Sequence, residues 1–383
     1  MAPANWSDQY PKPLILIAAQ SGRFLAQMAH RAGYRVRVAD QFADLDTLAI
    51  AQQHRLLPDF NKLCDDQFLQ TLSELASDQP AILMIGTGIE RVFHALANLP
   101  ANILSANNAL PALITCLTAK SWFALLSDLA IAYPHSQFSL PVNADNFLQK
   151  TIRHWGGGHI HRPSQSAHAA VYYQQKINGT SGSVLFISNG DEVRLLSLNQ
   201  QYCRDAAQDD YQLLAVANTL AVTEDQRQWL KQTCQKLSQT LNLRGFQSLD
   251  FIIDDTDQCW VLELNPRPSA SLQCLPVEWP LFDWHLQACQ GQLADLEDFP
   301  LAPPYVWYCC YAHQDLTVPA QFDWPEYAGD LPAANTFIAK DQIICSLLFS
   351  GATPDNLKHG QNLATQLQLQ LQNALEKPLN SAI

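Results

Sequence analysis

A pair of neighbouring strands with an acidic face constrains this chain more than any other stretch. Residues 245–267 read GFQSLDFIIDDTDQCWVLELNPR, where two runs with the alternation of antiparallel strands flank the turn-forming residues 255–258. A four-residue connection there would close a hairpin and fix which residues pair. The facing residues would then be Asp254 with Cys259, Ile252 with Val261, and Asp250 with Glu263.

The period of two along each strand separates the two faces of this hairpin. Asn265 falls on the same face as Glu263, which makes that face acidic and polar. The other face carries the apolar side chains that can pack, namely Phe251, Ile253, Trp260, Leu262 and Leu264. The sequence therefore predicts a hairpin with one core-facing side and one acidic side.

The opposed carboxylates of Asp250 and Glu263 allow two interpretations. Like charges directly opposite in a strand pair are destabilising, and Cβ atoms at about 5 Å are close enough for both groups to bind one hard cation. The alternative is an exposed hairpin whose acids face water, as one face of an antiparallel sheet commonly does. The pairing alone leaves both interpretations open.

The end of the second strand resembles a family motif. The run Glu263-Leu-Asn265-Pro-Arg267, with an aspartate at the paired position, resembles the closing motif of the ATP-grasp superfamily. In that family an Asp, a Glu and an Asn on such a hairpin hold the Mg²⁺ ions that bridge ATP phosphates. The resemblance implies that Asp250, Glu263 and Asn265 bind Mg²⁺ or Mn²⁺. It also implies that Arg267 is catalytic and steadies the reacting phosphate or carboxylate.

Composition argues against several other classes of protein. Hydrophobic residues make up 48% of the 383 residues and charged residues 15%, which is a globular composition. The 23 Lys plus Arg and 36 Asp plus Glu give a net charge of −13, which disfavours general binding to nucleic acid or to an anionic membrane. We therefore expect neither as a partner, and any phosphate site must be local.

The ten cysteines indicate a reducing compartment. They form no CxxC pair, and two of them, Cys309 and Cys310, are adjacent, which is not typical of a disulfide scaffold or a zinc cluster. The early apolar run at residues 14–19 is too short for a membrane span or a signal-peptide core. We therefore expect a cytoplasmic protein.

The first 110 residues have the pattern of a parallel α/β domain and resemble a pre-ATP-grasp domain. Residues 14–40 read as strand, helix and strand, and residues 81–86 as another buried strand. The loop Gly86-Thr-Gly88-Ile-Glu90 could approach a substrate closely, or it could be a plain strand-to-helix turn. A dinucleotide site is less favoured, because no G-x-G-x-x-G follows the first strand.

Two lysines and a glycine run match further positions of the resemblance. Residues 109–130 are helical in pattern, and Lys120 matches a family lysine that contacts phosphate, although a lone helix lysine can simply be solvated. Lys150 matches a strand lysine that contacts the α-phosphate and the adenine side. The resemblance also implies that Lys150, like Arg267, is catalytic and stabilises the transferred charge. The Gly-rich loop that follows, which would fold over the phosphates, comprises Gly156, Gly157 and Gly158.

Three histidines and one arginine flank that loop, and the next strand pair matches the adenine-binding hinge. The histidines His154, His159 and His161 are a weak zinc signal, since an H-x-H pair here has no third ligand at a suitable spacing. Contact of these histidines and Arg162 with phosphate or substrate is favoured over zinc, and simple exposed loop residues are a comparable alternative. The resemblance places the hinge at Gln174, Gln175, Lys176 and Ile177, and the ribose acid near Ser181. Gln174 and Ser181 depart from the acids usual at these positions. Gln174 can still accept a hydrogen bond from the adenine amino group through its side-chain carbonyl oxygen, so the departures put only the ribose contacts in doubt.

The predicted fold class is α/β, with an N-terminal Rossmann-like pre-ATP-grasp domain followed by a two-lobed α+β ATP-grasp domain. More than one packed unit is expected at this length. The expected divisions are 1–110 for the first domain, 111–200 for the small lobe with the Gly-rich loop, 201–300 for the large lobe with the hairpin, and 301–383 for strands and a helix completing the large lobe.

The resemblance implies a carboxylate-amine ligase of the EC 6.3 type. ATP would phosphorylate a small-molecule carboxylate to an acyl phosphate, an amine would attack, and ADP and phosphate would leave. Within the superfamily the chain looks most similar to carboligases that build small cofactors of the methanofuran or tetrahydromethanopterin type, and a homodimer is compatible with it. Two alternatives remain open, an ATP-dependent phosphotransferase and a non-catalytic nucleotide-binding module.

Overall fold

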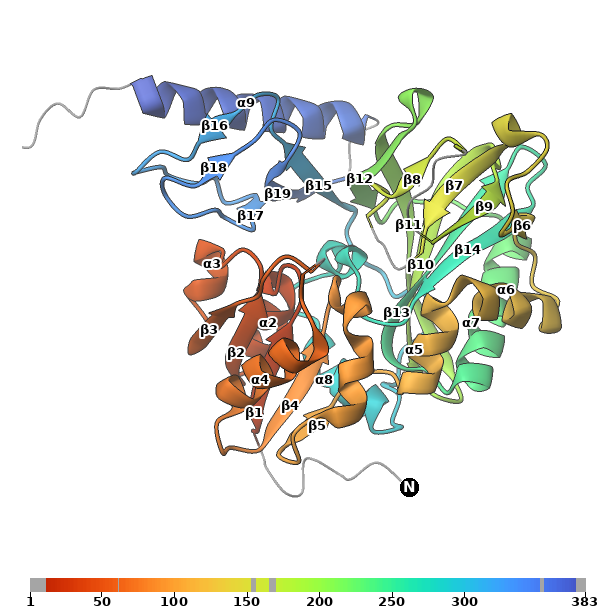
Figure 1. Ribbon diagram of the computed structural model, residues 1–383, viewed down its shortest axis with the longest axis horizontal. Helices are drawn as coiled ribbons and strands as arrows, with labels where there is room; N and C mark the ends of the chain where they lie inside the picture. Colours follow the sequence, from red (N-terminus) through yellow and green to blue (C-terminus); the bar gives the residue numbers. More distant parts are fainter. Residues whose placement is uncertain (1–11, 61, 153–155, 165–169, 352–354, 377–383) are drawn as a thin grey trace, which may run out of the picture.

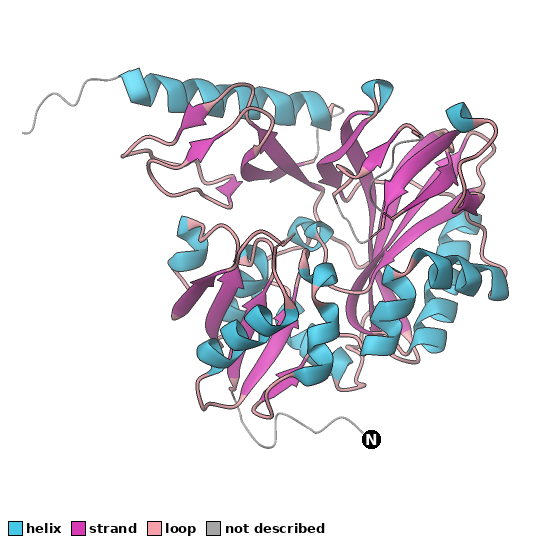
Figure 2. Ribbon diagram, in the orientation of Figure 1, coloured by secondary structure: helices cyan, strands magenta, loops and turns pink. Residues whose placement is uncertain are grey.

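The computed structural model of the protein describes residues 12–60, 62–152, 156–164, 170–351 and 355–376. These residues form a parallel sheet of five strands, an antiparallel sheet of eight strands and two smaller sheets, with helices packed around them (Figure 1, Figure 2). The fold class predicted from the sequence, a parallel α/β part followed by an antiparallel part, is confirmed.

The N-terminal part is a parallel sheet with helices, as its continuous apolar runs predict. Its elements, including two short 3-10 helices (η), are β1 (Leu14–Ala18), α2 (Arg23–Arg31), β2 (Arg35–Asp40), α3 (Leu45–Leu48), β3 (Gln53–Leu56), α4 (Asp65–Ala76), β4 (Ala81–Ile85), η1 (Ile89–Arg91), η2 (Phe93–Asn98) and β5 (Ile103–Ser105). The strand order is β3-β2-β1-β4-β5, and every neighbouring pair is parallel. Strands β1 and β4 are buried along their whole length, because helices cover both faces of such a sheet.

The stretch predicted as one helix over residues 109–130 is two helices, α5 (Leu110–Leu117) and α6 (Ala119–Asp128), bent by 94°. Thr118 between them is extended, and the bend lets both helices place apolar side chains in the core beneath the acidic hairpin. Within the described residues no single helix is long and apolar enough to cross a membrane, and this bent pair passes that test only when its halves are joined.

The rest of the described chain forms a large antiparallel sheet, a four-stranded antiparallel sheet, called the small sheet below, and a two-stranded pair of β16 with β18. The small sheet has the order β6-β9-β7-β8, with β6 (Ser136–Gln137), β7 (Phe147–Thr151), β8 (Ile160–His161) and β9 (Val171–Gln175). The large sheet has the order β14-β13-β10-β11-β12-β15-β19-β17. Its strands are β10 (Gly179–Asn189), β11 (Val193–Asp205), β12 (Asp210–Ala217), β13 (Arg244–Asp254), β14 (Cys259–Asn265), β15 (Tyr305–Tyr311), β17 (Ala328–Gly329) and β19 (Ile343–Ser350).

Helices and short elements complete this second part. They are η3 (Ala144–Asn146), η4 (Ala206–Gln208), α7 (Glu224–Leu241), η5 (Ala270–Cys274), α8 (Leu281–Cys289), β16 (Leu316–Thr317), β18 (Phe337–Ile338) and α9 (Asn356–Glu376). Helix α7 begins with a capping box, in which Thr223 and Gln226 bond each other's backbone. Helix α9 lies along the large sheet beside β15 (Figure 1).

The predicted register of the acidic hairpin is confirmed at the acid pair but is wrong nearer the turn. Asp250 lies opposite Glu263 as predicted, but Ile252 lies opposite Trp260, and Ile253 opposite Cys259. A β-bulge between the two regions inserts one extra residue in β14, which shifts the pairing by one. The buried residues of β14 are therefore Cys259, Val261 and Leu264, whereas Trp260 and Leu262, predicted to pack, are only half-buried.

Asp40 ends β2, where a dinucleotide-binding α/β domain would place its ribose-binding acid. Both of its oxygens are already used: Oδ2 accepts the Gly22 N–H at 3.0 Å, and Oδ1 accepts the N–H groups of Phe42 and Ala43. Oδ1 also lies 2.8 Å from the His54 Nε2. This carboxylate therefore shapes the loop, which agrees with the missing G-x-G-x-x-G pattern.

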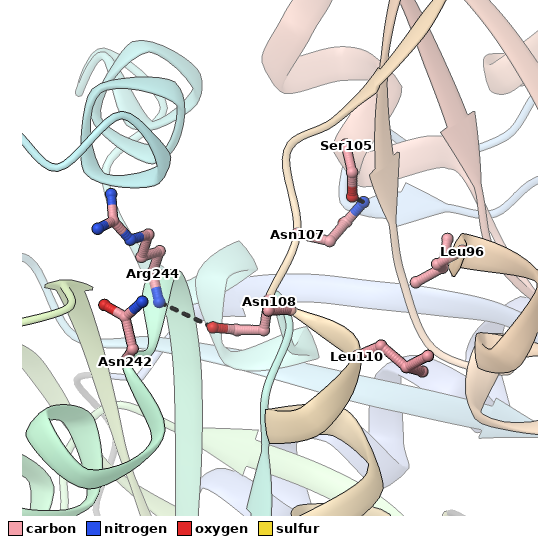
Figure 3. A pocket seen from close by; sticks show the side chains of 8 residues that line it. Leu96, Ser105, Asn107, Asn108, Leu110, Asn242 and Arg244 are labelled. Carbon is pink, nitrogen blue, oxygen red and sulfur yellow. Dashed lines mark hydrogen bonds between the residues drawn. The ribbon is translucent and has the colours of Figure 1, made fainter. Parts of the chain in front are cut away.

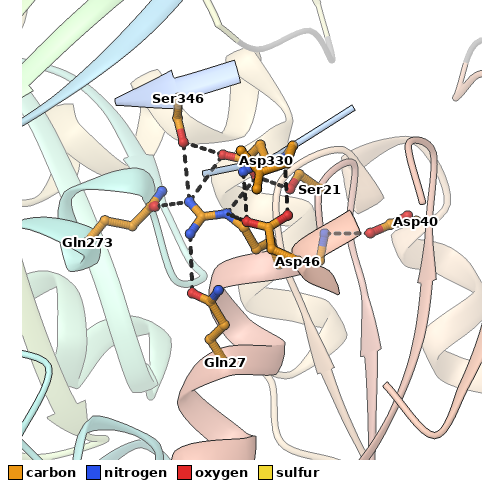
Figure 4. A network of polar contacts seen from close by, with 10 residues as sticks. Ser21, Gln27, Asp40, Asp46, Gln273, Asp330 and Ser346 are labelled. Atoms are coloured by element: carbon orange, nitrogen blue, oxygen red, sulfur yellow. Dashed lines mark hydrogen bonds and ion pairs between the residues drawn. The ribbon is translucent and has the colours of Figure 1, made fainter. Parts of the chain in front are cut away.

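Arg23 ties the parallel sheet to the C-terminal strands (Figure 4). It is the first residue of α2, is buried, and pairs with Asp330 at 3.0 Å and Asp46 at 3.6 Å. Its Nη2 also donates to Gln273 of η5 and, at 3.3 Å, to Ser346 of β19. A guanidinium with five donors suits such a junction, because one side chain satisfies acceptors from four segments.

His285 on α8 is buried and joins two other elements. Its Nδ1 accepts the N–H of Phe246 on β13 at 3.1 Å, and its Nε2 lies 2.9 Å from the carbonyl oxygen of Ala106. Burial lowers the pKa of His285 from 6.5 to about 4, against the opposing effect of that carbonyl. The imidazole is therefore neutral in the folded protein at neutral pH.

We expect the protein to lose stability as the pH falls from about 6.5 to about 4, because the unfolded chain takes up the His285 proton first. The full effect is about 3 kcal/mol at 1.36 kcal/mol per pKa unit. Urea unfolding between pH 7 and 4 measures it, with His285→Gln as the non-titrating comparison. Equal slopes of unfolding free energy against pH in both proteins would contradict this assignment.

Candidate nucleotide and metal site

The acid pair of the hairpin is in electrostatic conflict. Asp250 and Glu263 lie directly opposite each other on β13 and β14, with Glu263 exposed. Burial and the Glu263 charge raise the pKa of Asp250, against hydrogen bonds from Gln201 and Ser248 and the charge of Arg267. A divalent cation between the two carboxylates would relieve this conflict.

The donor set fits a hard cation that is shared with phosphates. Among the described residues, no three His, Cys, Asp or Glu side chains gather closely enough to hold a metal by themselves. Mg²⁺ commonly takes only one or two carboxylates and completes its octahedron with phosphate oxygens and water. Asp250 and Glu263, with the amide oxygen of Asn265 nearby, match that requirement.

A chain of polar contacts runs from the acid pair to Arg267. The Asn265 Nδ2 donates to the Asp250 Oδ2 at 3.3 Å, and the Arg267 Nη2 donates to the Asn265 Oδ1 at 3.1 Å. The Arg267 Nη1 also donates to the Pro268 carbonyl at 3.1 Å, and the side chain is buried. The four motif residues predicted from the sequence are thus brought together at one end of the hairpin.

Glu90 completes this chain and was not predicted as a site residue. Its Oε1 lies 2.6 Å from the Arg267 Nε, and both side chains are about nine-tenths buried. Its Oε2 accepts the N–H of Gly88 at 2.6 Å, and Gly88 has φ +101°, which only glycine adopts readily. For the loop at residues 86–90 the sequence left two interpretations open, substrate contact or a plain turn. In the structure this loop places Glu90 against Arg267.

Water is nearly excluded from this ion pair. The cavity beside Glu90 and Arg267 has a volume of only about 10 Å³ and is otherwise lined mainly by apolar side chains such as Phe93 and Leu113. A space of that size holds at most one water molecule. The charge of Arg267 is therefore balanced by protein groups, which fixes its orientation.

Lys150 on β7 faces the hairpin from the small sheet. It is buried, and its Nζ donates to the Gln174 Oε1 at 2.8 Å. Burial lowers the pKa of Lys150, and the nearby charges of Glu263 and Asp250 oppose that change. The Gln174 amide nitrogen in turn donates to the Ser136 Oγ at 3.2 Å. The side-chain oxygen predicted to read adenine is thus occupied by Lys150 in this structure.

The Gly-rich loop packs against β12. The Gly156 carbonyl accepts the N–H of Leu213 at 3.1 Å. A Cβ on Gly157 would lie 1.9 Å from the carbonyl oxygen of Tyr211, and this residue has φ +82°. Arg162 after the loop pairs with Asp209. His154 lies outside the described residues.

The remaining predicted residues line the connection between the two sheets. Gln175 and Lys176 are exposed at the end of β9, and the Lys176 Nζ lies 5.9 Å from the centre of the Tyr211 ring. Ile177 and Ser181 are half-buried, and the Ser181 Oγ donates to the Gln201 Oε1 at 3.4 Å. Because Gln201 also bonds Asp250, Ser181 is connected to the acid pair.

Lys120 is exposed as the second residue of α6, the helix that begins after the bend at Thr118. No hydrogen bond or ion pair to another described residue involves its ammonium group. Its geometry is therefore equally compatible with phosphate contact and with a solvated charge.

Part of this chain matches a known protein family. Residues 122–271 match a family described as the ATP-grasp domain. No curated protein sequence matches the chain.

Solved structures share its fold over nearly the whole length. The N5-carboxyaminoimidazole ribonucleotide synthetase from Thermotoga maritima is 11% identical, with a TM-score of 0.64 over 94% of this chain and 98% of that chain. The N5-carboxyaminoimidazole synthase from Aspergillus clavatus, solved with ADP and 5-aminoimidazole ribonucleotide, is 12% identical, with a TM-score of 0.67 and coverages of 93% and 98%.

The biotin carboxylase domain of 2-oxoglutarate carboxylase from Hydrogenobacter thermophilus, solved with MgADP, ADP and bicarbonate, is similar as well. It is 10% identical, with a TM-score of 0.67 over 88% of this chain and 86% of that chain. At these identities the likeness establishes a shared fold.

Proposed function

We propose that this chain, which contains an ATP-grasp domain over residues 122–271, is an ATP-dependent ligase that joins a small-molecule carboxylate to an amine. The observation that carries the proposal is the continuous contact chain Asp250–Asn265–Arg267–Glu90 opposite the buried Lys150. It combines an acid pair that can bind a metal ion with two positively charged side chains, Lys150 and Arg267, that are held in place. That combination suits the transfer of a phosphoryl group to an oxyanion.

In the proposed reaction the protein positions groups and balances charge. Lys150 would pair with ATP phosphate oxygens, and Arg267, held by Glu90, would orient the acceptor carboxylate. Mg²⁺ held by Asp250, Glu263 and Asn265 would supply charge neutralisation on the phosphates. Transfer of the γ-phosphoryl group would give an acyl phosphate and ADP. Attack by the amine would then form the amide and release phosphate, so no protein nucleophile is needed.

The solved structures of similar fold support a nucleotide site between the acid pair and Lys150, since two of those named above hold ADP and one of them also holds magnesium. The ten free cysteines fit a reducing cytoplasm, where we propose the protein acts. We further propose, from the sequence resemblance alone, that the product belongs to a small cofactor of the methanofuran or tetrahydromethanopterin type.

The test is a screen of carboxylates and amines scored by ADP release, repeated with hydroxylamine in place of the amine. A ligase should give a hydroxamate with its carboxylate, because hydroxylamine attacks an acyl phosphate. ADP release with a phosphorylated acceptor and no hydroxamate would identify a phosphotransferase instead. No ADP release despite tight Mg-ATP binding would favour a non-catalytic module.

Gly157→Ala should lower kcat/KM for ATP by about 10- to 100-fold, the range expected when a positioning element is displaced by about 1 Å. The added Cβ would meet the Tyr211 carbonyl, and the loop would have to leave β12. Gly156→Ala is the matched control, because Gly156 has a similar φ of +72° but no atom within 4 Å of its Cβ position. Equal losses in both variants would mean that backbone strain, not docking on β12, is responsible.

A further inference from the structure

The Gln174 side chain is buried in the small sheet rather than open to a ligand. It lies on β9 between Ser136 of β6 and Leu148 of β7, and Gln174 is only 2% exposed. Figure 3 shows a cavity of about 300 Å³ lined by residues from the segments 96–110 and 242–244, and neither it nor the small cavity beside Arg267 is lined by a residue of the small sheet. An adenine ring would therefore have to displace neighbouring side chains to reach the Gln174 amide.

Both ends of the Gln174 amide are used, and their orientation is fixed by their partners. The Gln174 Oε1 accepts a hydrogen bond from the Lys150 Nζ at 2.8 Å, and an ammonium group can only donate. The Gln174 Nε2 donates to the Ser136 Oγ at 3.2 Å, while that hydroxyl donates its own proton to the Pro134 carbonyl at 2.8 Å. The amide therefore cannot turn over without placing its NH₂ group against the ammonium group of Lys150.

The same contacts hold the end of the Lys150 side chain in place. Lys150 lies opposite Tyr172 on β9, two residues from Gln174, so lysine and glutamine share one face of the small sheet. A lysine side chain is long and flexible, and a fixed acceptor at 2.8 Å restricts where its ammonium group can lie. An acid at position 174 would form an ion pair with Lys150 and offset its charge, whereas the neutral amide leaves that charge available for phosphate oxygens.

We propose that Gln174 is a positioning residue for Lys150 and does not select the base of the nucleotide. This role rests on the proposed function, in which Lys150 pairs with ATP phosphate oxygens, and it replaces the contact with adenine that the sequence led us to expect of Gln174. Recognition of the base falls instead to other residues of the hinge, of which Gln175 and Lys176 are exposed. Because all nucleoside triphosphates share their phosphates, loss of Gln174 should weaken their binding to the same extent.

The test compares ATP with purine riboside triphosphate, which differs from ATP only in lacking the amino group of the base. Dissociation constants of both magnesium complexes are measured on the full chain by calorimetry, with no carboxylate or amine present. Gln174→Leu should weaken both by the same factor, about 10- to 100-fold, because a hydrogen bond to a charged group is lost. A loss confined to ATP would show that Gln174 reads the amino group and would overturn the proposal.

Lys150→Met and the double variant Lys150→Met/Gln174→Leu test whether Gln174 acts through Lys150. The double variant should bind each nucleotide as weakly as Lys150→Met alone, within about twofold, because without the ammonium group Gln174 has nothing left to position. A loss in the double variant equal to the product of the two single losses would mean that the two residues act independently. That result would also overturn the proposal.

Ser136→Ala is a milder variant that keeps the test decisive if Gln174→Leu fails to fold, as thermal unfolding of the ligand-free protein would show. It removes the acceptor of the Gln174 Nε2 and leaves the bond between Gln174 and Lys150 in place. It should weaken both nucleotides by an equal and smaller factor, and an ATP-selective loss would again contradict the proposal. Wild type that bound neither nucleotide would be a different result, since the proposed nucleotide site itself would then be wrong.

Discussion

Glu263→Gln is expected to reduce Mg²⁺-dependent ADP formation by about 100- to 1,000-fold, the usual loss when one charge-stabilising group is removed from such a site. Glutamine keeps the shape of the side chain but removes one anionic oxygen from the pair opposite Asp250. The proposed Mg²⁺ would lose a ligand, and the charge of the transferring phosphoryl group would be less well balanced. ADP release under saturating Mg-ATP measures the loss.

The same substitution should hardly change the stability of the ligand-free protein, because two small effects oppose each other. Removing the repulsion between opposed carboxylates stabilises a strand pair by about 0.5 kcal/mol. Removing the Glu263 charge also removes an attraction to the buried Lys150. Urea unfolding should therefore give a free energy within about 1 kcal/mol of wild type.

Asp257→Asn is the matched control, since Asp257 is an exposed acid in the turn of the same hairpin and asparagine tolerates its φ of +63°. It should keep both activity and stability. If Glu263→Gln instead lowered stability and kept ADP formation near wild type, Glu263 would be a structural acid and the metal site would be wrong.

The sequence located the acid pair but not the details of its hairpin. Alternation and a four-residue turn were enough to place Asp250 opposite Glu263. The bulge at the middle of the hairpin could not be read from the pattern, because Trp260 and Val261 are both acceptable core residues. Burial of Val261 against the bent pair α5–α6 decides between them, and that contact is tertiary.

Side-chain partners between distant segments were the other limit of prediction. The motif resemblance identified Lys150 and Gln174 separately as nucleotide-binding residues, but it did not predict the hydrogen bond between them. Their contact depends on the pairing of β7 with β9, which places Gln174 opposite Leu148, two residues from Lys150. The same limit explains why Glu90 was missed, since it lies 177 residues from Arg267. Gly86 and Gly88 were the only sequence signal near Glu90, and they are equally typical of a plain strand-to-helix turn.

Glu90→Gln and Arg267→Met should each destabilise the protein by about 3 kcal/mol, because each leaves one buried charge without its partner. Both should also lower ADP formation. We expect the larger loss, about 100-fold or more, from Arg267→Met, since it removes the charge proposed to face the reacting groups. The loss from Glu90→Gln should be smaller, because the guanidinium stays and only its orientation is relaxed.

The double variant Glu90→Gln/Arg267→Met separates folding from function. With both charges gone, no unpaired ion is left in the dry region beside Phe93, so the free energy of unfolding should return to within about 1 kcal/mol of wild type. Activity should remain as low as in Arg267→Met, because stability is restored without the cation. A double variant as unstable as the sum of the two single variants would mean that Glu90 and Arg267 act independently. If the double variant recovered ADP formation, the charge of Arg267 would not be needed for the reaction. Another positively charged group would then have to pair with the reacting carboxylate.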